Sequence, residues 1–240
     1  MADIFEQKWK ERFSQAAKGE EQNKDQSLLI EGNPYYREYF LEYAGAILGK
    51  GVPGMKVLDV GCGTGSTCRV LAERGFEVYG VDFSPEIIEA AKKKAAKNNV
   101  SLNLQVADIY QLPFPDNIFD IVVCNYLFQT VSNPERVLQE ALRVLKPKGR
   151  VFVITLNSLS VGRFLLRDDV KLYNPLKMRR TMERLGFIDI SIRGVYLFTK
   201  VFDWLVFWIL RLKIYKAFNL FFPLFIFLSH SFYLAAQKKA

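Results

Sequence analysis

The sequence has few of the residues that form disulfides and metal sites. It contains one histidine, His230, and three cysteines, with no CxxC pair and no even set for a disulfide framework. The N-terminus is charged throughout and has no apolar run of the signal-peptide type. We therefore expect a protein of a reducing compartment, without an export signal and without a bound metal.

Internal repeats, low-complexity tracts and basic-aromatic nucleic-acid modules are also absent from the sequence, so no nucleic-acid partner is expected. Charged residues make up 24% of the chain, too many for a protein embedded throughout in a membrane. The net charge of +8 is concentrated in residues 151–240, which hold 14 Lys and Arg against 5 Asp and Glu. A basic region that is also strongly apolar favours an anionic membrane surface as a partner.

From residue 55 onward, short apolar strands alternate with amphipathic helices. Strands are predicted at 55–60, 76–82, 101–108, 118–125 and 187–195, and a turn followed by a strand at 146–156. Helices are predicted at 66–75, 84–98, 133–145 and 173–186. This alternation predicts an α/β fold with a Rossmann-like, doubly wound, mostly parallel sheet of seven strands and helices on both faces. We divide the chain into an N-terminal helical cap (1–50), a core (51–195), an apolar and basic insertion (196–229) that is expected to be helical, and a closing strand (230–240).

A glycine-rich loop, GCGTGS, follows the first predicted strand. Its three glycines, Gly61, Gly63 and Gly65, let the backbone turn sharply and come close to a ligand, and the next helix offers unpaired N–H groups. Asp82 ends the second strand about twenty residues later, where a carboxylate can accept hydrogen bonds from ribose hydroxyls. The combination predicts a site for a nucleoside-containing cofactor.

The loop differs from the dinucleotide fingerprint GxGxxG, because Ser66 stands where that pattern has its last glycine. Asp59 ends the strand just before the loop. Its carboxylate would repel a pyrophosphate but would attract a positively charged amino group. This argument favours S-adenosylmethionine (SAM) over NAD as the cofactor.

Four segments of the chain, taken together, resemble the class I SAM-dependent methyltransferase family and are most similar to its small-molecule, quinone and lipid members. They are VLDVGCGTGS, VYGVDFSPEII, VADIYQLPFPDNIFDIVVCNYLFQTV and LQEALRVLKPKGRVFVIT. The resemblance is strong over residues 55–156 and weaker over 174–195 and 230–237.

The resemblance implies roles for particular residues in holding SAM. Gly61, Gly63 and Gly65, with Cys62 among them, would approach the methionine part of the cofactor, and Asp59 would meet its amino group through water. Asp82 would hold the ribose and Phe83 would pack on the adenine. Asp108 and Ile109 would lie at the adenine edge, and Asn125 beside the loop and the substrate mouth. For Asp82 and Asp108, a solvated strand-end carboxylate or a helix cap is the alternative, and Cys62, Cys68 and Cys124 are interpreted as small packing residues.

Methyl transfer needs alignment of the nucleophile, the methyl group and the sulfur, and an oxygen acceptor usually needs a base as well. Many members of the family carry a histidine shortly after the fourth strand, whereas this chain has Phe128 and Gln129 there. His230 is therefore the candidate catalytic base, with a polar turn or interface residue as the alternative. The candidate substrate residues are Tyr35, Tyr36, Tyr126 and Gln129; for the first two, ordinary packing is an equal alternative.

The insertion, residues 196–229, stands where the family has a short turn. Residues 217–236 form a run of 20 without a formal charge, but Pro223 interrupts it and the closing strand takes its last third, which leaves too few residues to cross a bilayer. An interfacial hairpin, apolar with Trp, Lys and Arg at its borders, fits an anionic membrane surface better. A contact between two copies of the chain in a homodimer remains open.

These observations lead to one main hypothesis and two alternatives. The main hypothesis is a cytoplasmic SAM-dependent methyltransferase, peripherally bound to a membrane, that acts on a hydrophobic or lipid-linked acceptor. The first alternative is a methyltransferase of a soluble small metabolite, with the insertion used for oligomerisation. The second is a SAM-binding scaffold without catalytic activity.

Overall fold

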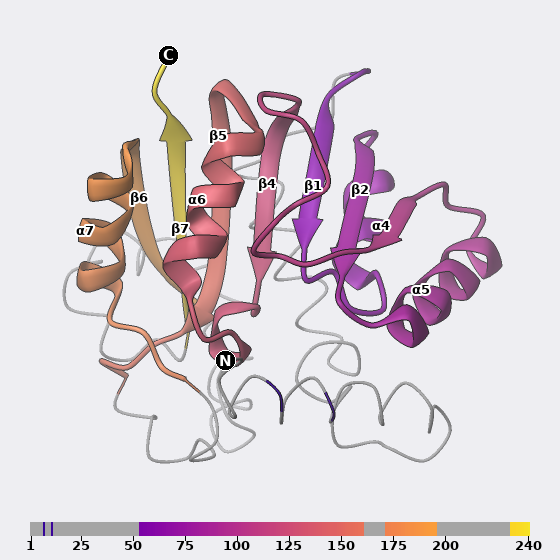
Figure 1. The fold of residues 1–240 in the computed structure, drawn as a ribbon, viewed down its shortest axis with the longest axis horizontal. Helices are drawn as coiled ribbons and strands as arrows, with labels where there is room; N and C mark the ends of the chain where they lie inside the picture. The colour runs from indigo at the N-terminus through magenta and orange to yellow at the C-terminus, as the bar shows by residue number, and fades with distance from the viewer. Residues whose placement is uncertain (1–6, 8–10, 12–52, 161–170, 196–230) are drawn as a thin grey trace, which may run out of the picture.

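The computed structural model describes residues 7, 11, 53–160, 171–195 and 231–240, and these ranges contain one seven-stranded sheet. The strand order is β3-β2-β1-β4-β5-β7-β6 (Figure 1). Neighbouring strands from β3 to β5 are parallel, while β7 runs antiparallel between β5 and β6. The predicted α/β fold with a mostly parallel sheet is therefore confirmed. The predicted cap and insertion lie outside the described residues, apart from residues 7 and 11.

The sheet and its helices follow the order that the sequence predicts. The strands are β1 Lys56–Val60, β2 Glu77–Asp82, β3 Asn103–Val106, β4 Phe119–Asn125, β5 Leu145–Leu156, β6 Phe187–Val195 and β7 Ser231–Lys238. The helices are α4 Ser66–Ala72, α5 Pro85–Lys97, α6 Pro134–Val144 and α7 Pro175–Leu185, with the single turn η1 Phe128–Thr130. Several boundaries differ from the prediction. Strand β3 is shorter than the predicted 101–108, and α4 ends at Ala72 instead of residue 75. Strand β5 begins already at Leu145, because Leu145 pairs with Phe119 before a register shift between Phe119 and Ile121.

Three helices begin with the same local device, a polar cap followed by proline. The side chain of Ser84 accepts from the N–H of Ile87 at the start of α5, and Asn133 and Asn174 cap α6 and α7 in the same way. Proline suits the first helical position because its fixed backbone angle is already helical and its missing N–H would have no helical partner there. These caps fix where each connection leaves the sheet and enters its helix.

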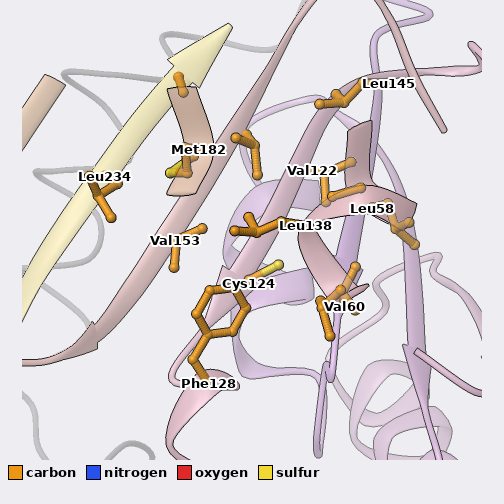
Figure 2. Close-up of a cluster of buried hydrophobic side chains, with 14 of the residues drawn as sticks. Leu58, Val60, Val122, Cys124, Phe128, Leu138, Leu145, Val153, Met182 and Leu234 are labelled. Carbon is orange, nitrogen blue, oxygen red and sulfur yellow. The ribbon is translucent and has the colours of Figure 1, made fainter. Parts of the chain in front are cut away.

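Alternate residues of the central strands face two different helical layers. On one face, Leu58, Val122 and Cys124 pack with residues of α6 and α7, including Leu138 and Met182 (Figure 2). On the other face, the remaining strand residues pack against α4 and α5; this second cluster includes Val57, Ile121, Val123, Cys68, Leu71, Ile88 and Ala91. Burial on both faces explains why the strands are almost continuously apolar. Because β1 to β5 pair in parallel, their carboxyl ends lie at one edge of the sheet.

None of the helices in the described ranges is long and apolar enough to cross a membrane. Residues 196–230, which include the predicted insertion, lie outside the described ranges.

Candidate cofactor site

The candidate site lies where the strand order reverses, between β1 and β4. From β1 the chain proceeds to β2 and β3 on one side of the sheet and then returns to β4 on the other side (Figure 1). In open sheets of this kind, ligands bind beyond the carboxyl ends of the strands at the switch point. The glycine loop follows β1, Asp82 ends β2 and Asn125 ends β4, so the sheet brings these predicted residues to one edge.

The glycine loop is anchored to β2 by its backbone. The N–H groups of Gly61 and Cys62 both donate to the carbonyl of Val81, at 2.8 and 2.9 Å. Gly63 has a φ of +52°, and a Cβ atom placed on it would meet no other atom within 4 Å. By contrast, a Cβ on Gly61 would lie 2.7 Å from Cδ1 of Leu127, in the segment after β4. Leu127 thus fills the space beside Gly61, whereas the space beside Gly63 holds no described protein atom within 4 Å.

Gly65, the third glycine of the loop, is the N-cap residue of α4 and has a left-handed backbone, with a φ of +80°. Its N–H donates to the carbonyl of Cys62 at 3.0 Å, and its carbonyl accepts from the N–H of Arg69 at 2.9 Å. A Cβ on Gly65 would lie 3.4 Å from Cβ of Ala91 on α5, an ordinary packing distance, so this position borders protein, unlike Gly63. Gly65 therefore has a local role in turning the chain into α4, and its expected approach to the methionine part of SAM stays a prediction.

Asp82 links the loops that follow three strands. Its Oδ2 accepts from the N–H of Gly63 at 3.0 Å, and its Oδ1 accepts from the N–H of Ser84 at 3.3 Å. Its own carbonyl accepts from the N–H of Ala107, just after β3, at 2.9 Å. Burial raises the pKa of this carboxyl, although the backbone N–H bonds oppose the rise. The carboxylate therefore stands within the loop cluster rather than in solvent.

Asp59 is the most deeply buried carboxylate of the site, with 1% of its surface exposed. The thiol of Cys68 donates to its Oδ2 at 3.3 Å, while Oδ1 has no hydrogen-bond partner among the residues that the structure describes. Burial, reinforced by the charge of Asp82, raises the pKa of Asp59 to about 7, although the Cys68 bond lowers it. A buried carboxylate oxygen without a partner is unfavourable, and a cationic ligand group would relieve that cost. The site thus fits the amino group of SAM.

The remaining predicted cofactor residues surround this centre. Asn125 donates from Nδ2 to Oγ1 of Thr67 at 2.9 Å, which joins the end of β4 to the first turn of α4. Phe83 follows Asp82 directly and is half-buried. In the loop after β3, Ile109 packs against the core, while the exposed Asp108 accepts from the N–H of Tyr110 at 2.9 Å. Their roles toward a cofactor stay predictions.

Two of the four predicted substrate residues are described, and both contact the β5–β7 side of the sheet. Tyr126 adopts a φ of +51° and donates from its hydroxyl to Oγ of Ser231, the first residue of β7, at 2.9 Å. Burial raises the pKa of Tyr126 to about 12, opposed by the Ser231 bond. Gln129 accepts from the hydroxyl of Thr155 on β5 at 3.4 Å. The other two, Tyr35 and Tyr36, and the candidate base His230 lie outside the described residues.

The sequence interpretation missed two side chains that support the site, Cys68 and Thr67. All three cysteines are free and buried, as expected of packing residues, but Cys68 also hydrogen-bonds to Asp59. Both side chains come from the first turn of α4, immediately after the glycine loop. That position was the available signal, because the first turn after such a loop faces back toward the strand ends.

Comparison with known proteins agrees with the geometry. Residues 58–153 match the family described as "Methyltransferase domain". The chain is 38% identical to the ubiquinone biosynthesis O-methyltransferase of Coxiella burnetii over 104 residues. This alignment covers 43% of the chain and 44% of that protein. Over 101 residues the chain is 41% identical to the demethylmenaquinone methyltransferase of Tropheryma whipplei, covering 42% of this chain and 41% of that protein.

A solved structure with the same fold is phosphoethanolamine N-methyltransferase 2 of Haemonchus contortus in complex with SAM. It matches with a TM-score of 0.63 and 22% identity, over 88% of this chain and 54% of that one. The predicted resemblance is confirmed: residues 58–153 match a methyltransferase domain, and the described sheet has the fold of a methyltransferase solved with SAM bound. The match spans less than half the length of the two bacterial relatives named above.

Proposed function

We propose that this protein is a SAM-dependent methyltransferase that acts on a hydrophobic, quinone-like or lipid-linked acceptor at a membrane surface. SAM as the cofactor is supported by Oδ1 of Asp59, which is buried and lacks a hydrogen-bond partner among the described residues. This atom lies below the glycine loop, where a Cβ atom on Gly63 would meet no atom within 4 Å. The proposed acceptor is supported by two of the relatives, which are a ubiquinone biosynthesis O-methyltransferase and a demethylmenaquinone methyltransferase.

The residues of the site would divide the work of holding the cofactor. Asp59 would bind the ammonium of its methionine part, and the open backbone at Gly63 would allow close approach. Asp82 would accept from the ribose with the lone pairs not used by the loop N–H groups, and Phe83, Asp108 and Ile109 would border the adenine. When bound, SAM supplies an electrophilic methyl group on a sulfonium. The protein's contribution is then alignment of that group with the acceptor and exclusion of water.

We assign to His230 the role of the base that activates the methyl acceptor. In the segment between β4 and α6, residues 126–133, the only titratable side chain is the hydroxyl of Tyr126. Its pKa of about 12 keeps it protonated at neutral pH, so it is a hydrogen-bond donor and not a base there. Gln129 would orient the acceptor. Replacing His230 with alanine should lower kcat strongly while leaving SAM affinity unchanged; retained turnover would remove His230 from this role.

The membrane part of the proposal depends on the basic, apolar insertion at residues 196–229. Replacing it with a short Gly/Ser bridge and measuring flotation with anionic liposomes tests this directly. The shortened protein should stay with the soluble fraction while its SAM affinity, measured in parallel, is retained. If it floats as well as the intact chain, the membrane surface is not the partner of this segment.

A methyl-transfer assay with tritiated SAM and a total lipid extract tests the function as a whole. Label in the lipid fraction is the expected result. Label only in the aqueous fraction would indicate a soluble metabolite as the acceptor. SAM binding without transfer to either fraction would indicate the non-catalytic scaffold.

A further inference from the structure

Cys68 occupies a constrained position below the glycine loop. It lies on α4, is fully buried, and its thiol donates to Oδ2 of Asp59 at 3.3 Å. Gly80 on β2 provides the space for this arrangement: a Cβ atom there would lie 3.0 Å from the sulfur atoms of both Cys68 and Cys62. The helix, the neighbouring strand and the loop therefore hold the thiol in one place against the carboxylate.

A thiol is a weak donor, and in an apolar core it usually packs without a specific acceptor. Here the acceptor is a carboxylate with 1% of its surface exposed, whose other oxygen has no partner among the described residues. In surroundings of low polarity, even a weak donor to an ionised group has a large effect on whether that group ionises. The Cys68 bond is therefore placed to influence the charge of Asp59.

We propose that Cys68 is a positioning residue for the cofactor: its thiol holds Asp59 in the ionised form and in the orientation that receives the ammonium group of SAM. This inference rests on the proposed function, because it requires Asp59 to be the acceptor for that ammonium. It goes further by assigning to a buried cysteine the control of cofactor affinity as a function of pH.

The titratable groups that face Asp59 can be named from each element packed against it in the described part of the chain. They are Cys68 on α4, Cys62 in the glycine loop, Asp82 at the end of β2 and Cys124 within β4. The three thiols are neutral at physiological pH, since burial raises the pKa of Cys124 and the pKa values of Cys62 and Cys68 are also raised. Asp82 is the other carboxylate, and its charge opposes ionisation of Asp59.

Cofactor binding should therefore release a proton when it starts from protonated Asp59. Below the pKa of Asp59 in the ligand-free protein, the apparent Kd should rise about tenfold per pH unit, because only the ionised carboxylate pairs with the ammonium. That pKa is about 7 with the Cys68 bond in place. Without the donor it moves higher, and the loss of affinity on acidification begins at a higher pH.

The experiment measures the Kd of S-adenosylhomocysteine, which keeps the same amino group, by calorimetry from pH 5.5 to 8.5 in the wild type and its variants. In Cys68→Ala, the midpoint of the Kd profile should shift upward by about one pH unit, giving affinity about tenfold weaker than the wild type at pH 6 and less than twofold weaker at pH 8.5. Cys68→Val, which has no donor but fills more of the space, should behave in the same way. Cys68→Ser restores a donor and should return the profile to that of the wild type.

Cys124→Ala is the matched control. It removes a thiol that is also buried, on the neighbouring strand β4, but this thiol forms no hydrogen bond to Asp59. It should lower the melting temperature without moving the profile. Profiles of Cys68→Ala and Cys68→Val that coincide with the wild type would overturn the inference, as would an equal shift in Cys124→Ala. A wild-type protein that binds no ligand at any pH would overturn the proposed function as well, whereas normal wild-type binding with unshifted variants overturns only the role of Cys68.

Discussion

The backbone N–H of Gly63 donates to Oδ2 of Asp82 across 3.0 Å, so a carboxylate at the end of β2 fixes the position of the loop after β1. The same side chain accepts from the N–H of Ser84, at the cap of α5. Asp82 thus has a structural role in the ligand-free protein as well as its proposed contact with the ribose. Because both roles use one carboxylate, the loop and the cofactor depend on the same residue.

Asp82→Ala should weaken SAM binding on the order of 100-fold or more, since hydrogen bonds to a charged group contribute about 1.5–3 kcal/mol each. Calorimetry checks the affinity, and a thermal melt checks that the protein is folded. Asp120→Ala is a suitable control, because Asp120 also accepts from a backbone N–H, that of Lys56, but at the opposite end of the sheet. Asp120→Ala should lose stability without losing affinity. Equal SAM affinity in Asp82→Ala and the wild type would refute the assignment of the site.

Gly63→Ala should weaken SAM binding at least tenfold while lowering stability by only about 1–2 kcal/mol, the usual cost of a left-handed conformation for alanine. The added methyl group meets no atom within 4 Å in the ligand-free chain, so any large effect must come from the space that the cofactor needs. Gly186→Ala is the matched control, with a φ of +100° and an equally open surrounding, but after α7. The two variants should lose similar stability, and only Gly63→Ala should lose affinity; an equal effect on affinity would contradict the prediction.

Asp59→Asn should stabilise the ligand-free protein above pH 7. The pKa of Asp59 is about 7 in the folded protein against an ordinary value of 3.8, so between these values the folded state binds more protons than the unfolded state. Wild-type stability therefore falls as pH rises through this window, and the loss is complete above pH 7.

The asparagine variant has no such loss, so its free energy of unfolding should exceed that of the wild type by an amount on the order of 4 kcal/mol at pH 8, with little difference below pH 4. Urea unfolding across this range measures both arms. The same variant should bind SAM more weakly, because the negative partner of the ammonium is gone. A stability difference that is constant with pH would show that the pKa of Asp59 is not raised.

Arg143→Met should lower the free energy of unfolding by about 3–5 kcal/mol, because it leaves the buried Glu140 without its charged partner. Arg143 donates to Glu140 and to the carbonyls of Leu112 and Phe114, and so ties the loop after β3 to α6. Glu140, in turn, accepts from the N–H of Leu112.

The double variant Arg143→Met with Glu140→Gln should recover part of the lost stability, since the unpaired charge is removed. The exposed pair of Arg184 and Glu135, at 2.7 Å, is the control. Arg184→Ala should change stability by less than about 1 kcal/mol. Equal losses in the two single variants, measured by urea unfolding, would mean that the Arg143 network contributes no more than an ordinary surface ion pair.

The strands and the cofactor loop could be predicted from the sequence because their signals are local. Gly61, Gly63 and Gly65 indicate a turn with positive φ, and the apolar runs before and after them indicate buried strands. The contacts of Cys68 and Tyr126 could not be predicted in this way. Cys68 reaches Asp59 only through the packing of α4 on β1, and Tyr126 reaches Ser231 only because β7 enters the sheet beside β5, 105 positions further along the chain. Such contacts depend on the register between distant elements, which no local pattern encodes.

The antiparallel strand β7 also has a consequence for the order in which this protein is assembled. Strand β6 has no sheet neighbour except β7 in the described part of the chain, and β7 pairs on its other side with β5. During synthesis, β6 leaves the ribosome well before Ser231–Lys238 and has no strand of this sheet to join until they follow. Within the described residues, pairing of β6 therefore depends on Ser231–Lys238. Contacts this distant in sequence form slowly, so closure of that edge is expected to be a late step in folding.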